Sequence, residues 1–90
     1  MSVKVVVPTV LRRYSGGQRT VEATGDTIAE VIDDLESRYR GISGRLVTEG
    51  ALNRFVNIYI DDDDVRYAGG LQAPVTENAT IMILPAVAGG

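Results

Sequence analysis

The sequence predicts a single small α+β domain, with a mixed sheet of about four to five strands and one main helix packed across one face. A capped amphipathic segment over residues 27–39 predicts the helix. Continuous apolar runs over residues 3–10 and 80–84 predict two strands in the centre of the sheet. Residues 55–60 alternate between two faces, which predicts another strand. The 90 residues fit one such domain.

The first two predicted strands form a hairpin. Residues 3–10 are rich in β-branched valine. Pro8 lies near the end of the run, where a strand best tolerates the loss of one backbone N–H donor. Gly16 and Gly17 close the connection that follows. Residues 18–23 are then expected to pair with the first strand.

The helix has a start signal, an apolar stripe and a stop signal. Thr27 is expected to cap its N-terminus, and Glu30 completes a capping box. The stripe at helical spacing consists of Ile28, Val31, Ile32, Leu35 and Tyr39. Gly41 is a suitable stop residue.

The second half of the chain supplies the remaining strands. Residues 42–53 predict a loop with a short helical turn. Residues 61–64 predict a turn, and residues 65–67 predict a short strand-like piece. Residues 80–84 form the last strand, which holds the end of the chain on a rigid base.

Composition excludes several functions. The chain has no Cys, which excludes thiolate chemistry. It also has no His, the residue that usually activates a nucleophilic serine as general base. A net charge of −3 argues against a nucleic-acid partner. No secretory signal or membrane span is apparent, so a cytoplasmic location is expected. The four aspartates at 61–64 lack the Gly and distal Glu of a calcium loop, so we expect a solvated turn and no metal site.

The chain ends on a segment that is poor in side chains, Pro85-Ala86-Val87-Ala88-Gly89-Gly90. We expect a domain over residues 1–84 and a flexible tail over residues 85–90. The α-carboxylate of Gly90 has no side chain beside it, which suits a narrow enzyme pocket in which that carboxylate reacts. A frayed terminus without function is the alternative.

The predicted strand at residues 55–60 divides its side chains between two faces. The face expected to contact the helix consists of Val56, Ile58 and Ile60. Phe55 and Tyr59 then lie on the opposite face with Val6, and either Ile81 and Ile83 or Met82 and Leu84 complete the patch. We interpret this face as a partner-docking patch. Core side chains or scattered exposed apolar residues are the alternative.

With this order of elements and this ending, the chain resembles the ubiquitin-like sulfur carrier proteins of the ThiS/MoaD type, which have a β-grasp fold. The resemblance covers essentially the whole chain. Its matching stretches are residues 7–12, 25–27, 41–43, 54–59, 64–66 and 83–90. The phrase Phe55-Val56-Asn57-Ile58-Tyr59 and the Pro-Ala-Val-Ala-Gly-Gly ending favour the CysO branch of that family.

The resemblance implies a protein co-substrate rather than an enzyme. A partner would adenylate the Gly90 carboxylate with ATP, and a sulfur donor would convert it into a thiocarboxylate for cysteine biosynthesis. Ala86, Val87, Ala88 and Gly89 are the residues expected to enter partner active sites. The implied partners are an adenylating and sulfur-transferring enzyme, a pyridoxal-phosphate cysteine synthase and a JAMM-type zinc peptidase. The chain itself is expected to bind no cofactor.

Three alternatives stay open at this point. The same carrier chemistry serves thiamine or molybdopterin synthesis with a different acceptor enzyme. A ubiquitin-like modifier would join Gly90 to lysine amines of other proteins. A plain interaction module would leave the tail chemically inert.

Overall fold

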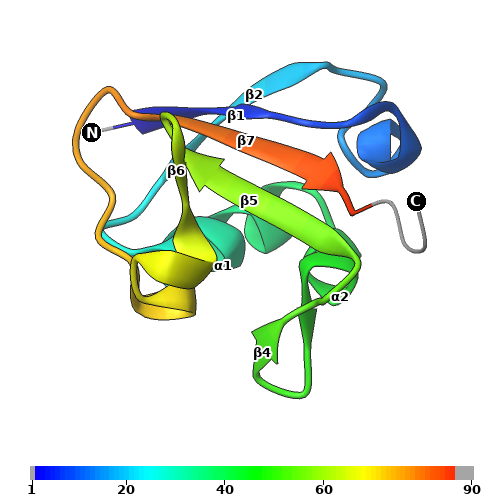
Figure 1. Cartoon of the computed structure of the whole chain (residues 1–90). Coiled ribbons are helices and arrows are strands. Elements are labelled where there is room, and N and C mark those ends of the chain that lie inside the picture. The colour runs from blue at the N-terminus through cyan, green and yellow to red at the C-terminus, as the bar shows by residue number, and fades with distance from the viewer. Residues whose placement is uncertain (1, 87–90) are drawn as a thin grey trace.

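The last strand of the chain lies at the centre of the sheet. The computed structural model describes residues 2–86. Its five-stranded sheet has the order β2-β1-β7-β5-β6 and lies above α1 (Ile28–Arg38) and α2 (Ser43–Leu46) in Figure 1. The strands are β1 (Ser2–Val6), β2 (Thr20–Thr24), β5 (Val56–Ile60), β6 (Asp63–Asp64) and β7 (Thr80–Pro85). β1 and β7 are parallel, and the other neighbouring strands are antiparallel.

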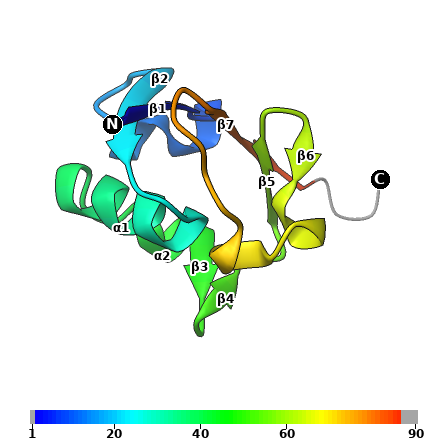
Figure 2. The same cartoon turned by 90° about the vertical axis from the view of Figure 1, so that its left-hand side faces the viewer.

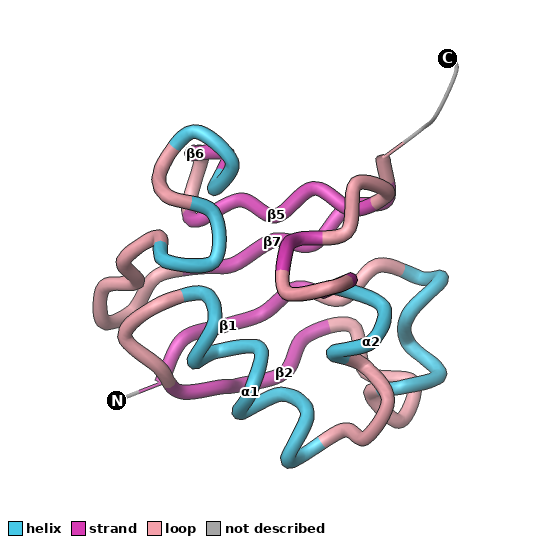
Figure 3. The backbone as a smooth tube through the Cα atoms, turned by 90° about the horizontal axis from the view of Figure 1, so that it is seen from below, coloured by secondary structure: helices cyan, strands magenta, loops and turns pink. Residues whose placement is uncertain are grey.

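Helical segments and a small ribbon connect these strands. They are η1 (Thr9–Tyr14), α1 (Ile28–Arg38), α2 (Ser43–Leu46), β3 (Val47–Thr48), β4 (Ala51–Leu52), η2 (Val65–Tyr67) and η3 (Gly70–Gln72), where η marks a 3-10 helix. The sheet twists from β2 at one edge to β6 at the other (Figure 2). Seen from below, α1 crosses the half of the sheet that contains β1 and β2 (Figure 3). A hairpin, one crossing helix and a parallel pair of first and last strands make the β-grasp fold expected from the sequence.

One face of the sheet and α1 form the core. The buried side chains of the sheet include Val3, Val5, Val21, Ala23, Ile58, Ile81 and Ile83. Those of α1 are Ile28, Val31, Ile32 and Leu35. Since alternate residues of a strand face opposite sides, burial of Ile81 and Ile83 turns Met82 and Leu84 outward. The structure thereby decides between the two alternatives that the sequence left open for β7.

The predicted cap of α1 is confirmed. The Thr27 hydroxyl accepts the Glu30 N–H at 3.3 Å. The Glu30 carboxylate accepts the Asp26 N–H at 2.9 Å, one residue before the position that a capping box usually uses. Gly25 lies so close to the helix that a Cβ atom there would be 2.6 Å from the Val31 nitrogen. The turn into α1 therefore requires glycine at this position.

A second carboxylate organises the other end of α1. The helix ends at Arg38, so Tyr39 is its C-terminal cap rather than the last member of the stripe. The Glu36 carboxylate accepts the Gly41 N–H at 3.0 Å and the Ser43 N–H at 3.0 Å. These backbone donors, with a smaller contribution from the charge of Arg40, lower the pKa of Glu36 below its ordinary value of 4.5.

We expect Glu36→Gln to make the unfolding free energy less dependent on pH in acid. Because the folded pKa of Glu36 is lowered, the stability that its carboxylate contributes is fully present above about pH 4.5 and is lost as the pH falls through the folded pKa. The stability difference between wild type and variant should therefore shrink below that pH. Urea unfolding between neutral and acid pH measures it. Glu77→Gln, at an exposed loop position, is the matched control, and an equal effect there would contradict the role of Glu36.

The first predicted strand is too long. β1 ends at Val6, and residues 9–14 form η1 instead of continuing the strand or a loop. Pro8 has no N–H with which to extend the ladder and is itself the N-terminal cap of η1. Leu11 of η1 is only 6% exposed, so core packing holds this segment against the sheet.

Two later segments also differ from the sequence-based prediction. Residues 47–52, expected to be loop, form the β3–β4 ribbon, whose turn places Glu49 at φ 53° and Gly50 at φ 79°. Residues 65–67, expected to be strand-like, form η2. The Asp64 side chain accepts the Arg66 N–H at 2.9 Å and caps this turn, while Val65 is fully buried beneath it.

Candidate functional site

The base of the C-terminal segment is the end of β7. Pro85 pairs with Val56, and the Ala86 N–H donates to the Phe55 carbonyl oxygen at 2.8 Å. The paired backbone therefore extends two residues beyond position 84, where the sequence-based boundary was drawn. Four residues follow Ala86 in the sequence, and they span at most about 14 Å when extended. Val87, Ala88, Gly89 and Gly90, the predicted reactive end, lie outside the described residues.

Arg66 holds the strand against which this base is paired. Its guanidinium donates to the carbonyl oxygens of Val56 and, at 3.2 Å, of Asn53, and to the Asn57 side chain. The Asn53 side chain also accepts the Phe55 N–H at 2.8 Å. These bonds fix the start of β5, so the last described residues of the chain rest on a braced strand. No local pattern indicates this role of Arg66, because the partners of its guanidinium lie at least nine residues away.

The outward face of the sheet carries an apolar patch, as the sequence predicts. Met82 lies directly between Val6 and Tyr59 in the register of the three strands. Phe55 is 52% exposed and lies beside the base of the C-terminal segment. The outer patch is defined as Val6, Phe55, Tyr59, Met82 and Leu84. Its role in docking a partner stays a prediction.

A groove of about 390 Å³ continues the outer patch towards η1. Its lining includes Val6, Pro8, Val10, Arg12, Arg19 and Leu84, and it is called the tail groove below. Figure 1 shows η1 beside the C-terminal end of β7. Val10 is 63% exposed in it, although the sequence-based prediction placed this residue in a strand. The groove was missed because it depends on η1 folding back beside β7, which the local sequence does not encode.

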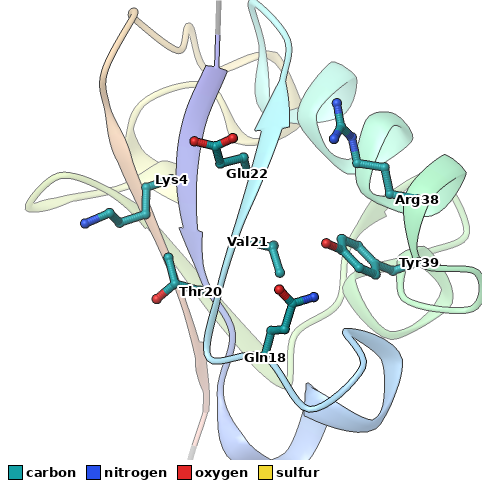
Figure 4. Close-up of a pocket in the computed structure, with 7 residues that line it drawn as sticks. All are labelled: Lys4, Gln18, Thr20, Val21, Glu22, Arg38 and Tyr39. Carbon is teal, nitrogen blue, oxygen red and sulfur yellow. The ribbon is translucent and has the colours of Figure 1, made fainter.

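A second hollow lies between β2 and the C-terminal end of α1, as Figure 4 shows. It is lined by Lys4, Gln18, Thr20, Val21, Glu22, Arg38 and Tyr39. Arg38 is bound to Asp34 at 2.9 Å and is not directed at a ligand. The hollow is separated from the end of β7 by β1, since the sheet order is β2-β1-β7. It therefore has no part in presenting the C-terminal segment.

Ser15, Asp61 and Asp64 make hydrogen bonds that support the local fold. The buried Ser15 hydroxyl donates to the Gln18 carbonyl oxygen at 2.8 Å. The Asp61 carboxylate accepts the Thr80 N–H at 3.1 Å, and Asp64 caps η2. Within residues 2–86, no three or more His, Cys, Asp or Glu side chains gather in a way that could hold a metal ion. No helix in this part of the chain is long and apolar enough to span a membrane.

Known proteins are similar to this chain in sequence and in fold. The sulfur carrier protein CysO of Mycobacterium tuberculosis is 53% identical over 93 residues, which cover all of both chains. A chain in the crystal structure of the Amycolatopsis orientalis BexX/CysO complex is 56% identical with a TM-score of 0.93, covering 98% of this chain and 99% of that one. Small archaeal modifier protein 1 of Methanosarcina acetivorans is 26% identical with a TM-score of 0.83, covering 99% and 96%.

The comparison with a family model agrees with these likenesses. The model of the ThiS family matches residues 5–90, which include all of the sheet except the start of β1. With the β-grasp topology and the outward patch beside the end of β7, this match settles the family. The chain belongs to the ThiS family.

Proposed function

We propose that this chain is a sulfur carrier whose working group is the Gly90 carboxylate. The observation that carries the proposal is the 53% identity to sulfur carrier protein CysO, which extends over the full length of both chains. The position of β7 supports the proposal. This central strand is paired up to Pro85, so only a few residues separate the sheet from Gly90. The chain is then a co-substrate, acting in the cytoplasm, and its partners supply the catalysis.

The proposed chemistry makes a poor acyl donor reactive. The Gly90 carboxylate attacks the α-phosphate of ATP in a partner enzyme, which releases pyrophosphate and forms an acyl-adenylate. A sulfur nucleophile then attacks the carbonyl carbon, and AMP leaves with the electron pair of the broken C–O bond. The product is a thiocarboxylate. Glycine at positions 89 and 90 keeps side chains away from both attacking groups.

Cysteine biosynthesis is the proposed pathway, because the relatives with more than half of their residues identical are CysO proteins. The proposed consumer of the thiocarboxylate is a pyridoxal-phosphate cysteine synthase, and a JAMM-type zinc peptidase would release the finished amino acid. Thiamine and molybdopterin synthesis remain as alternative destinations of the sulfur. Supplying the loaded carrier to each acceptor enzyme separately distinguishes these pathways by which enzyme consumes it.

A protein modifier is the second candidate, favoured by the 26% identity to small archaeal modifier protein 1. To separate the two, the chain is incubated with the adenylating enzyme of the same cell, ATP and hydrosulfide, and its intact mass is measured. Exchange of one oxygen for one sulfur supports the carrier. Conjugates to other proteins without that exchange would establish the modifier instead.

The outer patch is the proposed docking face for these partners. We expect Tyr59→Glu to weaken binding of the adenylating enzyme about tenfold or more, because a charge would be buried in the centre of an apolar contact. Binding is measured by titration calorimetry, and circular dichroism checks the fold. Thr48→Glu introduces the same charge on the exposed β3 strand and should bind normally. Unchanged affinity of the Tyr59 variant would remove the patch from the docking face.

A further inference from the structure

The two ends of β7 carry opposite charge. At its start, the Asp61 backbone and carboxylate bond to Thr80, so Asp61 lies at this end of the sheet, whereas Asp64 pairs with Tyr59 nearer the middle of the sheet. Glu77 precedes the same end of the strand. At its other end, β7 leads to Ala86 and the segment proposed to react. A strand of six residues separates the ends by about 17 Å.

Four arginines lie around the C-terminal end of β7, which leads to the segment proposed to react. Arg12 and Arg19 line the tail groove together with Leu84 and Pro85. On the other side, Arg54 stacks 5.0 Å from the centre of the Phe55 ring, and the Phe55 carbonyl oxygen holds Ala86. The Arg66 guanidinium bonds to Val56, the partner of Pro85. Arg12, Arg19, Arg54 and Arg66 are called the arginine rim.

Within the described residues no rim arginine forms an ion pair, although the Asp64 carboxylate accepts the Arg66 backbone N–H at 2.9 Å. Over residues 2–86 the ion pair found is between Arg38 and Asp34, outside the rim. Arg12 donates its Nε proton to the Val7 carbonyl oxygen at 3.1 Å, and Arg66 donates to neutral oxygens. These bonds orient two guanidinium groups without cancelling their charge. The lining of the tail groove likewise contains no Asp or Glu.

The tail groove adds an apolar floor to the charged rim. Val10 is 63% exposed and Leu84 is 40% exposed, and Pro8 lines the same groove. An apolar centre with a charged border is the usual composition of a protein–protein contact. Arginine is also among the residues enriched in such contacts, because its guanidinium binds carboxylates in a fixed geometry.

We propose that the arginine rim and tail groove dock a partner whose active-site entrance is bordered by carboxylates and presents an apolar side chain to the groove. This inference rests on the proposed function, in which residues 87–90 enter that entrance. The net charge of −3 alone predicts repulsion from such a partner. However, the Debye length is about 10 Å at 0.1 M salt, so Asp61, bonded to the far end of β7 some 17 Å away, is largely screened while the rim is in contact. The separated charges would also turn the chain so that its reactive end approaches first.

The test compares two double variants with the same change in net charge. Arg19→Gln/Arg54→Gln removes two rim charges that make no hydrogen bond within the described residues. Ser2→Glu/Thr76→Glu adds two negative charges at exposed positions away from the rim. Association with the adenylating enzyme is measured by interferometry without ATP, and loading is measured by intact mass, each from 20 mM to about 1 M salt.

We expect the rim variant to lose roughly tenfold in association rate and in kcat/KM at low salt, and to approach wild type at about 1 M salt. Its loading at saturating enzyme should be normal, and the control pair should stay within about twofold of wild type. Equal behaviour of rim variant and wild type, or an equal loss in the control pair, would overturn the inference.

The two readouts separate this inference from the proposed function. Salt-dependent association that requires the rim, without transfer of sulfur, would support the inference and refute the carrier. Transfer of sulfur with no dependence on the rim would support the carrier and refute the inference. A wild-type chain that neither associates nor gains sulfur would refute both.

Discussion

Removing Gly90 should abolish sulfur loading and leave the fold intact. The proposed reaction needs the carboxylate at a fixed distance from the folded domain. That distance is counted from Ala86, whose N–H donates to the Phe55 carbonyl oxygen. Deletion moves the carboxylate inward by about 3.5 Å, and adding one residue after Gly90 moves it outward by the same amount. A misplacement of about 1 Å can cost a hundredfold in rate, so both variants should load at least that much more slowly.

Loading by both variants is followed by intact mass, and thermal unfolding checks the fold. The matched control is Thr48→Ser at an exposed position on β3, which keeps the length of the chain and the Ala86 backbone donor. It should load at a rate near that of wild type. Normal loading of the shortened and the lengthened chain would show that Gly90 is not the reacting residue.

Ile83→Ala should destabilise the domain by about 2–5 kcal/mol, because it leaves a cavity beneath the central strand. Ile83 is 1% exposed and lies on the face of β7 that is buried in the hydrophobic core. A loss of this size is a large part of the roughly 5–15 kcal/mol that stabilises a small domain. Partial unfolding of β7 would then also reduce loading at elevated temperature, because this strand carries the base of the reactive segment.

The neighbouring residue provides the control for Ile83. Met82 is 37% exposed and points to the opposite face, so Met82→Ala should cost no more than about 1 kcal/mol of stability. Its main effect is expected on partner affinity, since Met82 lies between Val6 and Tyr59 in the outer patch. Urea unfolding of the two variants compares their stabilities. Equal losses would mean that β7 does not divide its side chains between core and partner.

The sequence predicts well those features that are decided within one element. Thr27 and Glu30 mark the start of α1 because a cap is made between residues three apart. The alternation at residues 55–60 places Tyr59 outward because only one face of β5 is buried. The continuous apolar run of β7 has no such alternation, so only its burial in the folded chain separates Ile83 from Met82.

Features that depend on distant segments were not predictable from local pattern. The tail groove requires residues of η1 to lie against the end of β7, more than seventy residues later in the chain. The bonds from Arg66 to the start of β5 likewise require η2 to fold back over that strand. In the sequence-based prediction Arg12 lies in a connection and Arg19 in a strand, and neither carries a local signal for a binding role. Their significance comes from the neighbours that the fold gives them.

The most direct test of the carrier locates the sulfur atom within the chain. After incubation with the adenylating enzyme, ATP and hydrosulfide, the protein is cleaved and the mass of its C-terminal fragment is measured. If the chain is a sulfur carrier, one sulfur replaces one oxygen at Gly90 and every other fragment keeps its mass. Sulfur on any other residue, or an unchanged C-terminal fragment after a reaction in which the enzyme has consumed ATP, would contradict the carrier.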